Sequence, residues 1–288
     1  MNSSRFEKEQ LKYLGNLLHF KTDDILLLCN QVSSFYREWD ELKKDKSTGK
    51  TKTYSDGTPK KRTIRPSSGL MKRIQASIKS NVLAKYPLPP NVHGGIKKKS
   101  NITNAKEHQG NKFIFTTDLQ DFFPNISYHQ LYAMYLNIGF TNHVAHWLTK
   151  LTSYKFELPQ GTPTSTHAAN LVFLPIDMEL IAFCKVNGIV YTRYVDDLVF
   201  SSQQDFRHLT KSLVEIVTRS HKFKISYRKT KYEGGQFITG IPVHNNYIDA
   251  PEKIKLRAKE ERLNHLPRMP LNNYLNNIRK TNTNCIIR

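Results

Sequence analysis

Apolar and polar positions in the first part of the chain follow the helical period. Two apolar stretches, residues 11–20 and 25–39, are separated by a break near Thr22. Apolar side chains that recur every three or four positions form one face of a helix. The pattern therefore predicts that residues 1–45 form a helical N-terminal segment.

The next stretch changes from polar to periodic. Residues 46–66 are polar and include Ser-Asp-Gly-Thr-Pro at 55–59, a composition typical of a mobile hairpin or loop. From Leu70 to Val82 an apolar residue recurs every four positions, which predicts an amphipathic helix that ends before Pro87. Further helices are predicted at 127–138, where Ser127 and Gln130 form a capping box, and at 144–151, 166–186 (kinked or interrupted at Pro175) and 205–219.

Short apolar runs predict the strands of one sheet. Residues 112–118 form an apolar run that ends in Asp118, which predicts a buried strand. Residues 189–194 and 198–202 alternate between apolar and polar side chains and predict a hairpin with two Asp residues at its tip. Strands at 223–227 and 235–243 follow. This order of elements predicts an α+β domain, in which an antiparallel sheet carries helices on one face.

The predicted hairpin tip, Tyr-Val-Asp-Asp at 194–197, places two carboxylates side by side. Adjacent carboxylates repel each other unless a cation lies between them, and a site made only of oxygen ligands favours Mg²⁺. Asp118 ends a neighbouring strand, so three carboxylates could meet and hold two Mg²⁺ about 3.5–4 Å apart. Adjacent acids can also have a purely structural role: Asp23 and Asp24 precede an apolar run and favour a helix N-terminus. Asp118, taken alone, can be explained as a turn residue at the end of a strand.

The charge of the chain points to a polyanionic partner. The 288 residues include 44 Lys and Arg against 24 Asp and Glu, a net charge of +20. The basic residues cluster, with eleven between residues 43 and 73 and five between 222 and 231. Because these stretches carry no amphipathic anchor or hydrophobic tail, nucleic acid is favoured over a membrane. We expect no membrane association.

Cysteine usage and apolar-run length indicate the compartment. Cys29, Cys184 and Cys285 are too few and too scattered for a disulfide framework or a zinc site, which indicates a reducing environment. The longest apolar run, residues 25–29, is far too short to cross a bilayer, and the N-terminus lacks a signal-peptide pattern. The expected location is the cytoplasm.

Several segments together resemble the motifs of reverse transcriptases. Phe-Thr-Thr-Asp-Leu-Gln-Asp-Phe-Phe at 115–123 is similar to their first palm motif, and Leu-Pro-Gln-Gly at 158–161 and Tyr-Val-Asp-Asp at 194–197 follow in the family's order. Asn-Ala-Lys-Glu-His at 104–108 and Ile-Thr-Gly at 238–240 resemble two elements of the bacterial retron enzymes, the second with Ile in place of Val. The chain departs from the pattern at Thr166, where the family has Pro, and at His93-Gly94-Gly95, which replaces His-Gly-aromatic.

The resemblance implies a right-hand polymerase fold of fingers, palm and small thumb, built on an antiparallel palm sheet. We expect an N-terminal helical extension at 1–45, fingers at 46–111, a palm at 112–245, and a small thumb with a C-terminal tail at 246–288. The helices within 127–151 are expected to pack with the fingers.

The resemblance also implies a metal site and a gate for the sugar. Asp118 and Asp196 are expected to bridge the metal ions, with Asp197 a weaker ligand and the backbone carbonyl of Leu119 a further one. Phe123 matches the bulky residue that excludes a nucleotide 2′-OH, because an aromatic ring beneath the sugar leaves no room for the extra oxygen. Phe122 should point the opposite way, into the core.

The remaining implied contacts are with nucleotide and RNA. Gln160 and Gly161 are expected beside the incoming nucleotide and the template base, where Gly permits close backbone approach. The other predicted contacts are Arg62 at the triphosphate, assisted by Lys60, Lys61 or Arg65; Lys229, as proton donor to pyrophosphate or as a nucleic-acid contact; and Asn104, His108, Ile238, Thr239 and Gly240 at the RNA.

The activity implied by the resemblance is that of a retron-type RNA-directed DNA polymerase. It copies part of a structured non-coding RNA into single-stranded DNA from a 2′-OH primer, using dNTPs and two Mg²⁺, and leaves a branched RNA–DNA product. A separate effector protein and a role in anti-phage defence are expected. The alternatives are another prokaryotic reverse transcriptase (group II-like or diversity-generating), an RNA-dependent RNA polymerase, which Phe123 disfavours, and a non-catalytic RNA-binding scaffold.

Overall fold

The computed structural model describes residues 3–44, 49–54, 56–219, 222–234, 237–264 and 267–283. The chain divides into two compact units. The first unit comprises Met1–Pro87 and Asp121–Val172, and the second comprises Leu88–Gln120 and Phe173–Arg288. The predicted boundaries of fingers, palm and thumb remain predictions.

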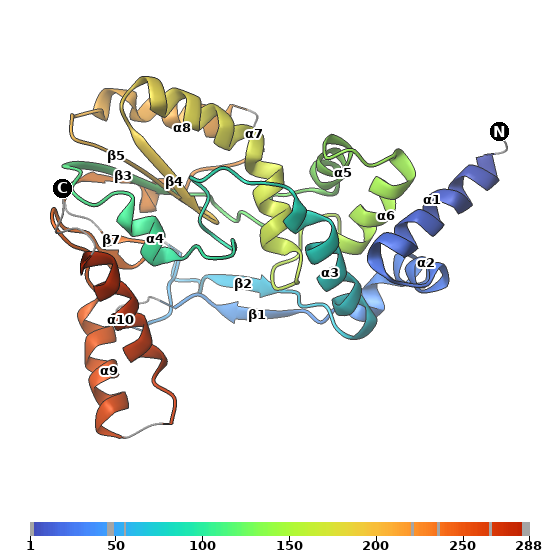
Figure 1. The fold of residues 1–288 in the computed structure, drawn as a ribbon, viewed down its shortest axis with the longest axis horizontal. Coiled ribbons are helices and arrows are strands. Elements are labelled where there is room, and N and C mark those ends of the chain that lie inside the picture. Colours follow the sequence, from blue (N-terminus) through green and yellow to red (C-terminus); the bar gives the residue numbers. More distant parts are fainter. Residues whose placement is uncertain are drawn as a thin grey trace. The chain divides into compact units, whose positions relative to one another are not determined.

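The first unit is mainly helical. Its helices contact one another in several pairs, among them α1 with α6, α3 with α6 and α5 with α6 (Figure 1). Their apolar stripes meet in a core that includes Leu14, Leu28, Ile74 and Leu148, each with no exposed surface. The helices are α1 (Ser3–Leu18), α2 (Thr22–Asn30), α3 (Gly69–Asn81), α5 (Tyr128–Asn137) and α6 (Asn142–Thr152), with two short 3₁₀ segments, η1 (Val32–Phe35) and η2 (Leu83–Lys85).

Local signals placed several of these helices correctly. The break predicted near Thr22 is the start of α2, and the periodic stretch that begins at Leu70 is α3. The predicted capping box opens α5: the hydroxyl of Ser127 accepts from the backbone N–H of Gln130, and the Gln130 side chain accepts from the backbone N–H of Ser127.

The helical prediction for residues 1–45 is wrong at its end. Strand β1 (Trp39–Leu42) pairs antiparallel with β2 (Lys61–Ile64), with Trp39 opposite Ile64. Opposite charges face each other across this hairpin and stabilise it. Because the two strands are about twenty residues apart in the sequence, the spacing of apolar residues within a short stretch does not reveal their pairing. The bridges Lys44–Thr51 and Thr53–Pro59 extend the hairpin, which was predicted for 46–66; residues 45–48 and Ser55 lie outside the described residues.

The second unit is built on a four-stranded antiparallel sheet in the order β4-β5-β3-β6. Strands β3, β4 and β5 are labelled in Figure 1. Its centre is apolar, and the rings of Phe115 and Phe200 lie 5.7 Å apart. The predicted strand at 112–118 and the predicted hairpin are therefore confirmed. The strands are β3 (Phe113–Asp118), β4 (Val190–Tyr194), β5 (Asp197–Ser202) and β6 (Lys231–Glu233).

Contacts from other segments cover both faces of this sheet, not one as predicted. Tyr191 and Arg193 point to one face, where they bond Asp177 of α7 (Ser165–Val186). Thr192, one residue between them, points to the other face and bonds His108, which follows α4 (Asn101–Lys106). The predicted interruption at Pro175 does not occur, because α7 is continuous through it.

The predicted strands after α8 (Thr210–Thr218) form differently. Residues 223–227 contribute one isolated bridge, Leu119–Ile225, before the 3₁₀ turn η4 (Tyr227–Lys229). In place of a long strand at 235–243 there is a tight hairpin of β7 (Phe237–Ile238) and β8 (Ile241–Pro242), while residues 235–236 lie outside the described part.

The C-terminal helices form an antiparallel pair, α9 (Glu252–Leu263) and α10 (Pro270–Thr283). The Glu261 carboxylate accepts from the backbone N–H groups of Leu271 and Asn272 and so caps the start of α10. Leu275 and Ile278 join these helices to a buried cluster that includes residues of β3, α4 and β8. Cys29 and Cys184 are buried free thiols, and Cys285 lies outside the described residues. None of the described helices is both long enough and apolar enough to cross a bilayer.

Candidate catalytic centre

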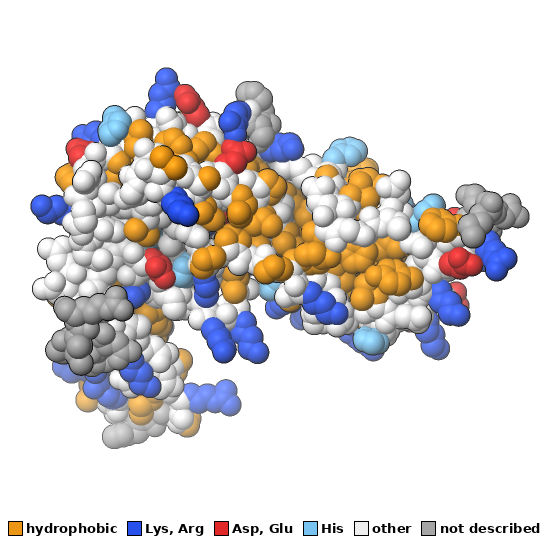
Figure 2. Space-filling view, turned by 45° about the horizontal axis from the view of Figure 1, so that its top comes forward, with side chains coloured by type: hydrophobic (Ala, Val, Ile, Leu, Met, Phe, Trp, Pro, Cys, Tyr) orange, Lys and Arg blue, Asp and Glu red, His pale blue; other side chains and the backbone are white. Residues whose placement is uncertain are grey.

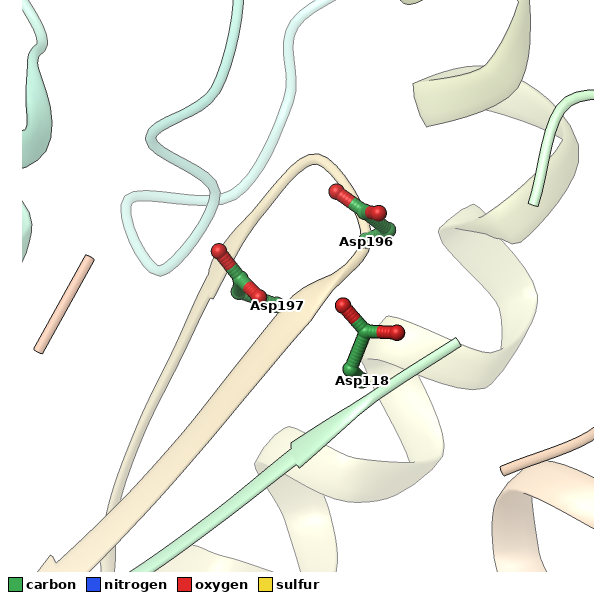
Figure 3. A group of neighbouring side chains, drawn as sticks. All are labelled: Asp118, Asp196 and Asp197. Atoms are coloured by element: carbon green, nitrogen blue, oxygen red, sulfur yellow. The ribbon is translucent and has the colours of Figure 1, made fainter. Parts of the chain in front are cut away.

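Three carboxylates meet at one end of the sheet of the second unit. Asp118, the last residue of β3, is paired in register with Asp197, the first residue of β5, and Asp196 lies in the turn just before it. One oxygen from each carboxylate can be chosen so that all three lie within 4.8 Å of one another (Figure 3). The convergence predicted from the strand ends is therefore confirmed.

The turn that carries Asp196 has an unusual backbone. Val195 and Asp196 connect β4 to β5, and Val195 has φ of 60°. A two-residue hairpin turn with positive φ at its first position normally has Gly there, so a β-branched residue at this position is strained. The carbonyl of Asp196 accepts from the backbone N–H of Leu119 at 2.9 Å. The chain thus holds the turn directly against the end of β3.

A lysine balances the negative charge of the cluster. Nζ of Lys229 lies 2.7 Å from Oδ2 of Asp118. Partial burial tends to lower the pKa of Lys229, but the hydrogen bond and charge of Asp118, with the charges of Asp196 and Asp197, outweigh it and raise the pKa. Lys229 is therefore an ammonium group at neutral pH.

The donor set fits a divalent metal ion. Asp118 has only 7% of its surface exposed, and Asp196 and Asp197 are partly buried. Carboxylate oxygens are the ligands preferred by Mg²⁺, and an ion among them relieves their repulsion. Within the described ranges, no second group of three or more His, Cys, Asp or Glu side chains has a comparable arrangement. Leu119 is buried beside Asp118, and the metal-binding role of its carbonyl stays a prediction.

The first unit carries all of the predicted nucleotide contacts except Lys229. Arg62 lies on β2 and forms an ion pair with Glu41 at 2.8 Å, with half of its side chain exposed. Exposed pairs of this kind contribute about 0–1 kcal/mol, so Arg62 can exchange its partner for a phosphate.

Phe122 is buried, as predicted for a core residue, whereas Phe123 is only half-buried.

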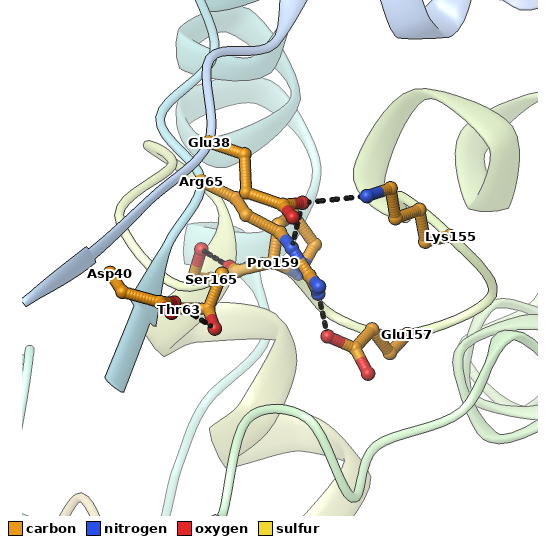
Figure 4. Close-up of polar contacts among 8 residues, drawn as sticks. All are labelled: Glu38, Asp40, Thr63, Arg65, Lys155, Glu157, Pro159 and Ser165. Carbon is orange, nitrogen blue, oxygen red and sulfur yellow. Dashed lines mark hydrogen bonds and ion pairs between the residues drawn. The ribbon is translucent and has the colours of Figure 1, made fainter. Parts of the chain in front are cut away.

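Arg65 differs from Arg62 because its side chain is held on two sides (Figure 4). Nε of Arg65 lies 2.7 Å from Glu38, and Nη1 contacts Glu157. Only 15% of the side chain is exposed. The backbone N–H of Arg65 also donates to the carbonyl of Gln160 at 3.0 Å. Arg65 therefore fastens the segment at 157–160 to the end of β2, which argues against its predicted role as a triphosphate ligand.

The Leu-Pro-Gln-Gly segment has a backbone that needs its glycine. Gly161 has φ of 103°, a conformation that side chains rarely adopt. The hydroxyl of Ser165 donates to the carbonyl of Pro159 at 2.6 Å and closes the loop (Figure 4). Gln160 is half-buried and Gly161 is exposed. Their contacts with nucleotide and template remain predictions.

Three of the predicted RNA contacts are buried, which argues against direct RNA binding by their side chains. Asn104, His108 and Ile238 each have no exposed surface. His108 bonds Ser201 at 2.7 Å and Thr192 at 2.6 Å, and so joins β5 to β4. Asn104 lies on α4 and His108 in the turn that follows it, and both side chains are buried in the core.

The other two residues of this set, Thr239 and Gly240, lie in the turn between β7 and β8. Thr239 is half-buried and Gly240 is exposed, and both have positive φ. The Asn104 amide donates to the Thr239 hydroxyl at 3.5 Å, so the Asn-Ala-x-x-His and Ile-Thr-Gly elements meet in the fold. RNA contact remains a prediction for Thr239 and Gly240 alone.

Comparison with known proteins agrees with this geometry. The family model described as reverse transcriptase (RNA-dependent DNA polymerase) matches residues 42–236, more than half of the chain. This span contains all three carboxylates and the Leu-Pro-Gln-Gly segment. The chain belongs to the reverse transcriptase family and has its right-hand polymerase fold.

Relatives narrow the family further. The chain is 35% identical over 204 residues to the Retron Ec86 reverse transcriptase of Escherichia coli, covering 69% of this chain and 64% of that protein. It is 30% identical over 223 residues to the Retron Mx162 reverse transcriptase of Myxococcus xanthus, covering 66% of this chain and 46% of that protein. The chain therefore belongs to the retron-type members of the reverse transcriptase family. It spans less than two thirds of the length of these two relatives.

Among solved structures, telomerase from Candida albicans in complex with a fragment of telomeric RNA aligns with a TM-score of 0.48. The identity is 9%, over 72% of this chain and 49% of that chain. A likeness of this size carries no argument about function.

Proposed function

We propose that this chain is the RNA-directed DNA polymerase of a retron. It copies part of a structured non-coding RNA into single-stranded DNA from dNTPs. The observation that carries the proposal is the meeting of Asp118, Asp196 and Asp197 at one end of the sheet, within the span that matches the family model.

The proposed cofactor is a pair of Mg²⁺ ions. Asp118 and Asp196 would hold them, with Asp197 and the carbonyl of Leu119 as lesser ligands. When bound, the two ions activate the attacking hydroxyl and stabilise the charge of the leaving pyrophosphate. The oxygen-only donor set and its partial burial support this proposal.

Other residues of the chain would handle the nucleotide. Arg62, in its exposed ion pair, is the proposed triphosphate ligand. Lys229 is protonated and within 2.7 Å of Asp118, which suits a donor of a proton to pyrophosphate. The half-buried ring of Phe123 would exclude a 2′-OH, and Gln160 would contact the nucleotide or the template base.

RNA is the proposed template and primer. On the face drawn in Figure 2, Lys and Arg side chains outnumber the acids, in keeping with the net charge of +20. Affinity for RNA should therefore fall steeply with salt. Priming from a 2′-OH, a branched product, an effector protein and a part in anti-phage defence belong to this proposal through the retron resemblance.

Expression with the flanking upstream DNA tests the proposal. The expected result is a short DNA whose mobility shifts after RNase or debranching treatment, and which is absent with Asp196→Ala. Polymerase activity on generic primed RNA without such a DNA would point to another prokaryotic reverse transcriptase. Unchanged cellular function in Asp196→Ala and Asp197→Ala cells would instead favour the RNA-binding scaffold.

A further inference from the structure

A buried ion pair joins α7 to β4 next to the turn that carries Asp196. Asp177 of α7 and Arg193 of β4 are both fully buried, and the guanidinium holds the carboxylate at two points, Nε–Oδ1 at 2.9 Å and Nη2–Oδ2 at 2.6 Å. The hydroxyl of Tyr191 also donates to Oδ1 of Asp177, at 2.7 Å. The Arg193 guanidinium lies 4.8 Å from the centre of the Phe173 ring, so its plane is fixed by packing as well as by charge.

Arg193 also reaches the turn itself. Its third nitrogen, Nη1, donates to the carbonyl of Val195 at 2.9 Å. Val195 is the strained residue with φ of 60°, immediately before Asp196. Strained backbone persists only where the surroundings hold it in place. The planar guanidinium of Arg193 can bond the Asp177 carboxylate and the Val195 carbonyl at once, whereas the single ammonium group of a lysine cannot.

Gly94 meets the same turn from another direction. Residues 91–93 run beside β4: the N–H of Arg193 donates to Asn91 at 2.9 Å, and the N–H of His93 donates to Arg193 at 2.8 Å. This pairing brings Gly94 against the turn. A Cβ on Gly94 would lie 2.4 Å from the nitrogen of Val195 and 2.5 Å from its Cγ2, distances that real Cβ atoms essentially never show.

We propose that Asp177, Arg193 and Gly94 are positioning residues that fix the turn at Val195, and through it the place of the Asp196 carboxylate in the metal site. The inference rests on the proposed function, since it assigns the three carboxylates to a divalent ion. Residues outside a metal's ligand set that orient its ligands typically change metal affinity 10–100-fold when mutated.

Titration of the full-length chain with Mn²⁺, followed by the electron paramagnetic resonance of the free ion, tests the inference. The part of the Mn²⁺ binding that is lost in Asp118→Asn is the binding at the carboxylate cluster. We expect Gly94→Ala and Arg193→Lys to weaken that Mn²⁺ binding by about tenfold or more in folded protein. Adding Val195→Gly to Gly94→Ala should recover part of the loss, because glycine removes Cγ2 and lets the backbone shift.

Leu213→Ala is the matched control for a purely structural effect. Leu213 lies on α8, is 1% exposed and is part of neither the turn nor the cluster. This variant should lower the urea midpoint and leave Mn²⁺ affinity unchanged. Gly94→Ala keeps the test available if Arg193→Lys fails to fold.

Wild-type Mn²⁺ affinity in folded Gly94→Ala would overturn the inference, as would a wild-type cluster that binds no Mn²⁺. The readout also separates this inference from the proposed function. A wild-type chain that binds Mn²⁺ at the cluster, shows the expected losses in both variants and makes no DNA would support the positioning role and refute the polymerase.

Discussion

Asp118 and Asp197 are direct register partners across β3 and β5, so two carboxylates face each other at one end of the sheet. Directly opposed like charges destabilise a sheet. Asp196 adds a third carboxylate from the turn, and Lys229 supplies a compensating charge. An arrangement that costs stability and collects oxygen ligands is typical of a site kept for function.

Replacing Asp196 by Asn should separate activity from stability. If Asp196 is a metal ligand as proposed, its loss removes several kcal/mol of transition-state stabilisation, so primer extension should fall by about 10³-fold or more. In metal-free buffer the same change should raise the free energy of unfolding by on the order of 1 kcal/mol, since one repelling charge is gone. Extension of a DNA primer on RNA and urea unfolding measure the two quantities.

Asp197→Asn is the comparison for that experiment. If Asp197 is the lesser ligand, its replacement should reduce extension by a smaller factor than Asp196→Asn does. Equal losses in the two variants would show that the proposed ranking of the two adjacent acids is wrong.

Lys229→Gln should change how stability depends on alkaline pH. The pKa of Lys229 is raised in the folded chain above its ordinary value of 10.5. The stability that its contact with Asp118 contributes is therefore fully present below pH 10.5 and is lost as the pH rises through the folded-state pKa. The Lys229→Gln variant should be less stable than wild type at pH 8, and the difference should shrink as the pH rises above about 10.5 and vanish above the folded-state pKa. Urea unfolding in metal-free buffer measures both proteins across this pH range. A stability difference between wild type and Lys229→Gln that does not change with pH would contradict the prediction.

His108 should make the second unit sensitive to acid. Burial, followed by the charge of His93, lowers the pKa of His108 to about 3 from its ordinary 6.5. Between these values the unfolded chain binds a proton that the folded chain excludes, so stability falls as the pH is lowered below 6.5. The loss approaches about 1.4 kcal/mol for each pH unit.

The control for this effect is His108→Gln, which can bond the Thr192 and Ser201 hydroxyls without titrating. Its free energy of unfolding should fall less than that of wild type between pH 6.5 and pH 4.5. His93, whose pKa burial also lowers, to about 4, remains in both proteins, so the difference between them reports mainly the titration of His108.

Much of the site was predictable from the sequence because its signals are local. The capping box at Ser127, the apolar run that ends in Asp118 and the alternation around the hairpin each lie within a few residues. Strand ends of one antiparallel sheet bring distant acids together, so the carboxylate cluster followed from those local patterns. The strand β1 did not follow, because its partner is about twenty residues away.

The remaining features depend on contacts that no short pattern marks. Asp177 and Arg193 are ordinary charged residues in sequence, and only the packing of α7 on β4 turns them into a buried pair. Asn104 and His108 looked like polar contacts with RNA, yet the docking of α4 buries both. Family motifs identify residues that matter, and burial then separates those that touch a ligand from those that hold the fold.

Arg62 and Arg65, three residues apart, should respond differently to alanine. Arg62→Ala should raise the KM for dNTP about tenfold and leave unfolding unchanged, because its pair with Glu41 is exposed. Arg65→Ala should lower the free energy of unfolding by about 1–3 kcal/mol, because Glu157 loses its pair with Arg65 and Glu38 is left with Lys155. Steady-state kinetics and urea unfolding of both variants check the contrast. A dNTP KM that changes only in Arg65→Ala would reverse the assignment.

Phe123→Ala should admit ribonucleotides. The ring of Phe123 is half-buried, whereas that of Phe122 is 3% exposed and belongs to the core. Forcing an extra oxygen against a packed ring costs about 1–3 kcal/mol, so its removal should raise the use of ATP relative to dATP about 10- to 100-fold. Phe122→Ala is the matched control: it should cost about 3–5 kcal/mol of stability and leave the sugar preference unchanged. Primer extension with each nucleotide measures the use of ATP relative to dATP. If Phe123→Ala keeps the wild-type preference for dATP, another residue excludes the 2′-OH.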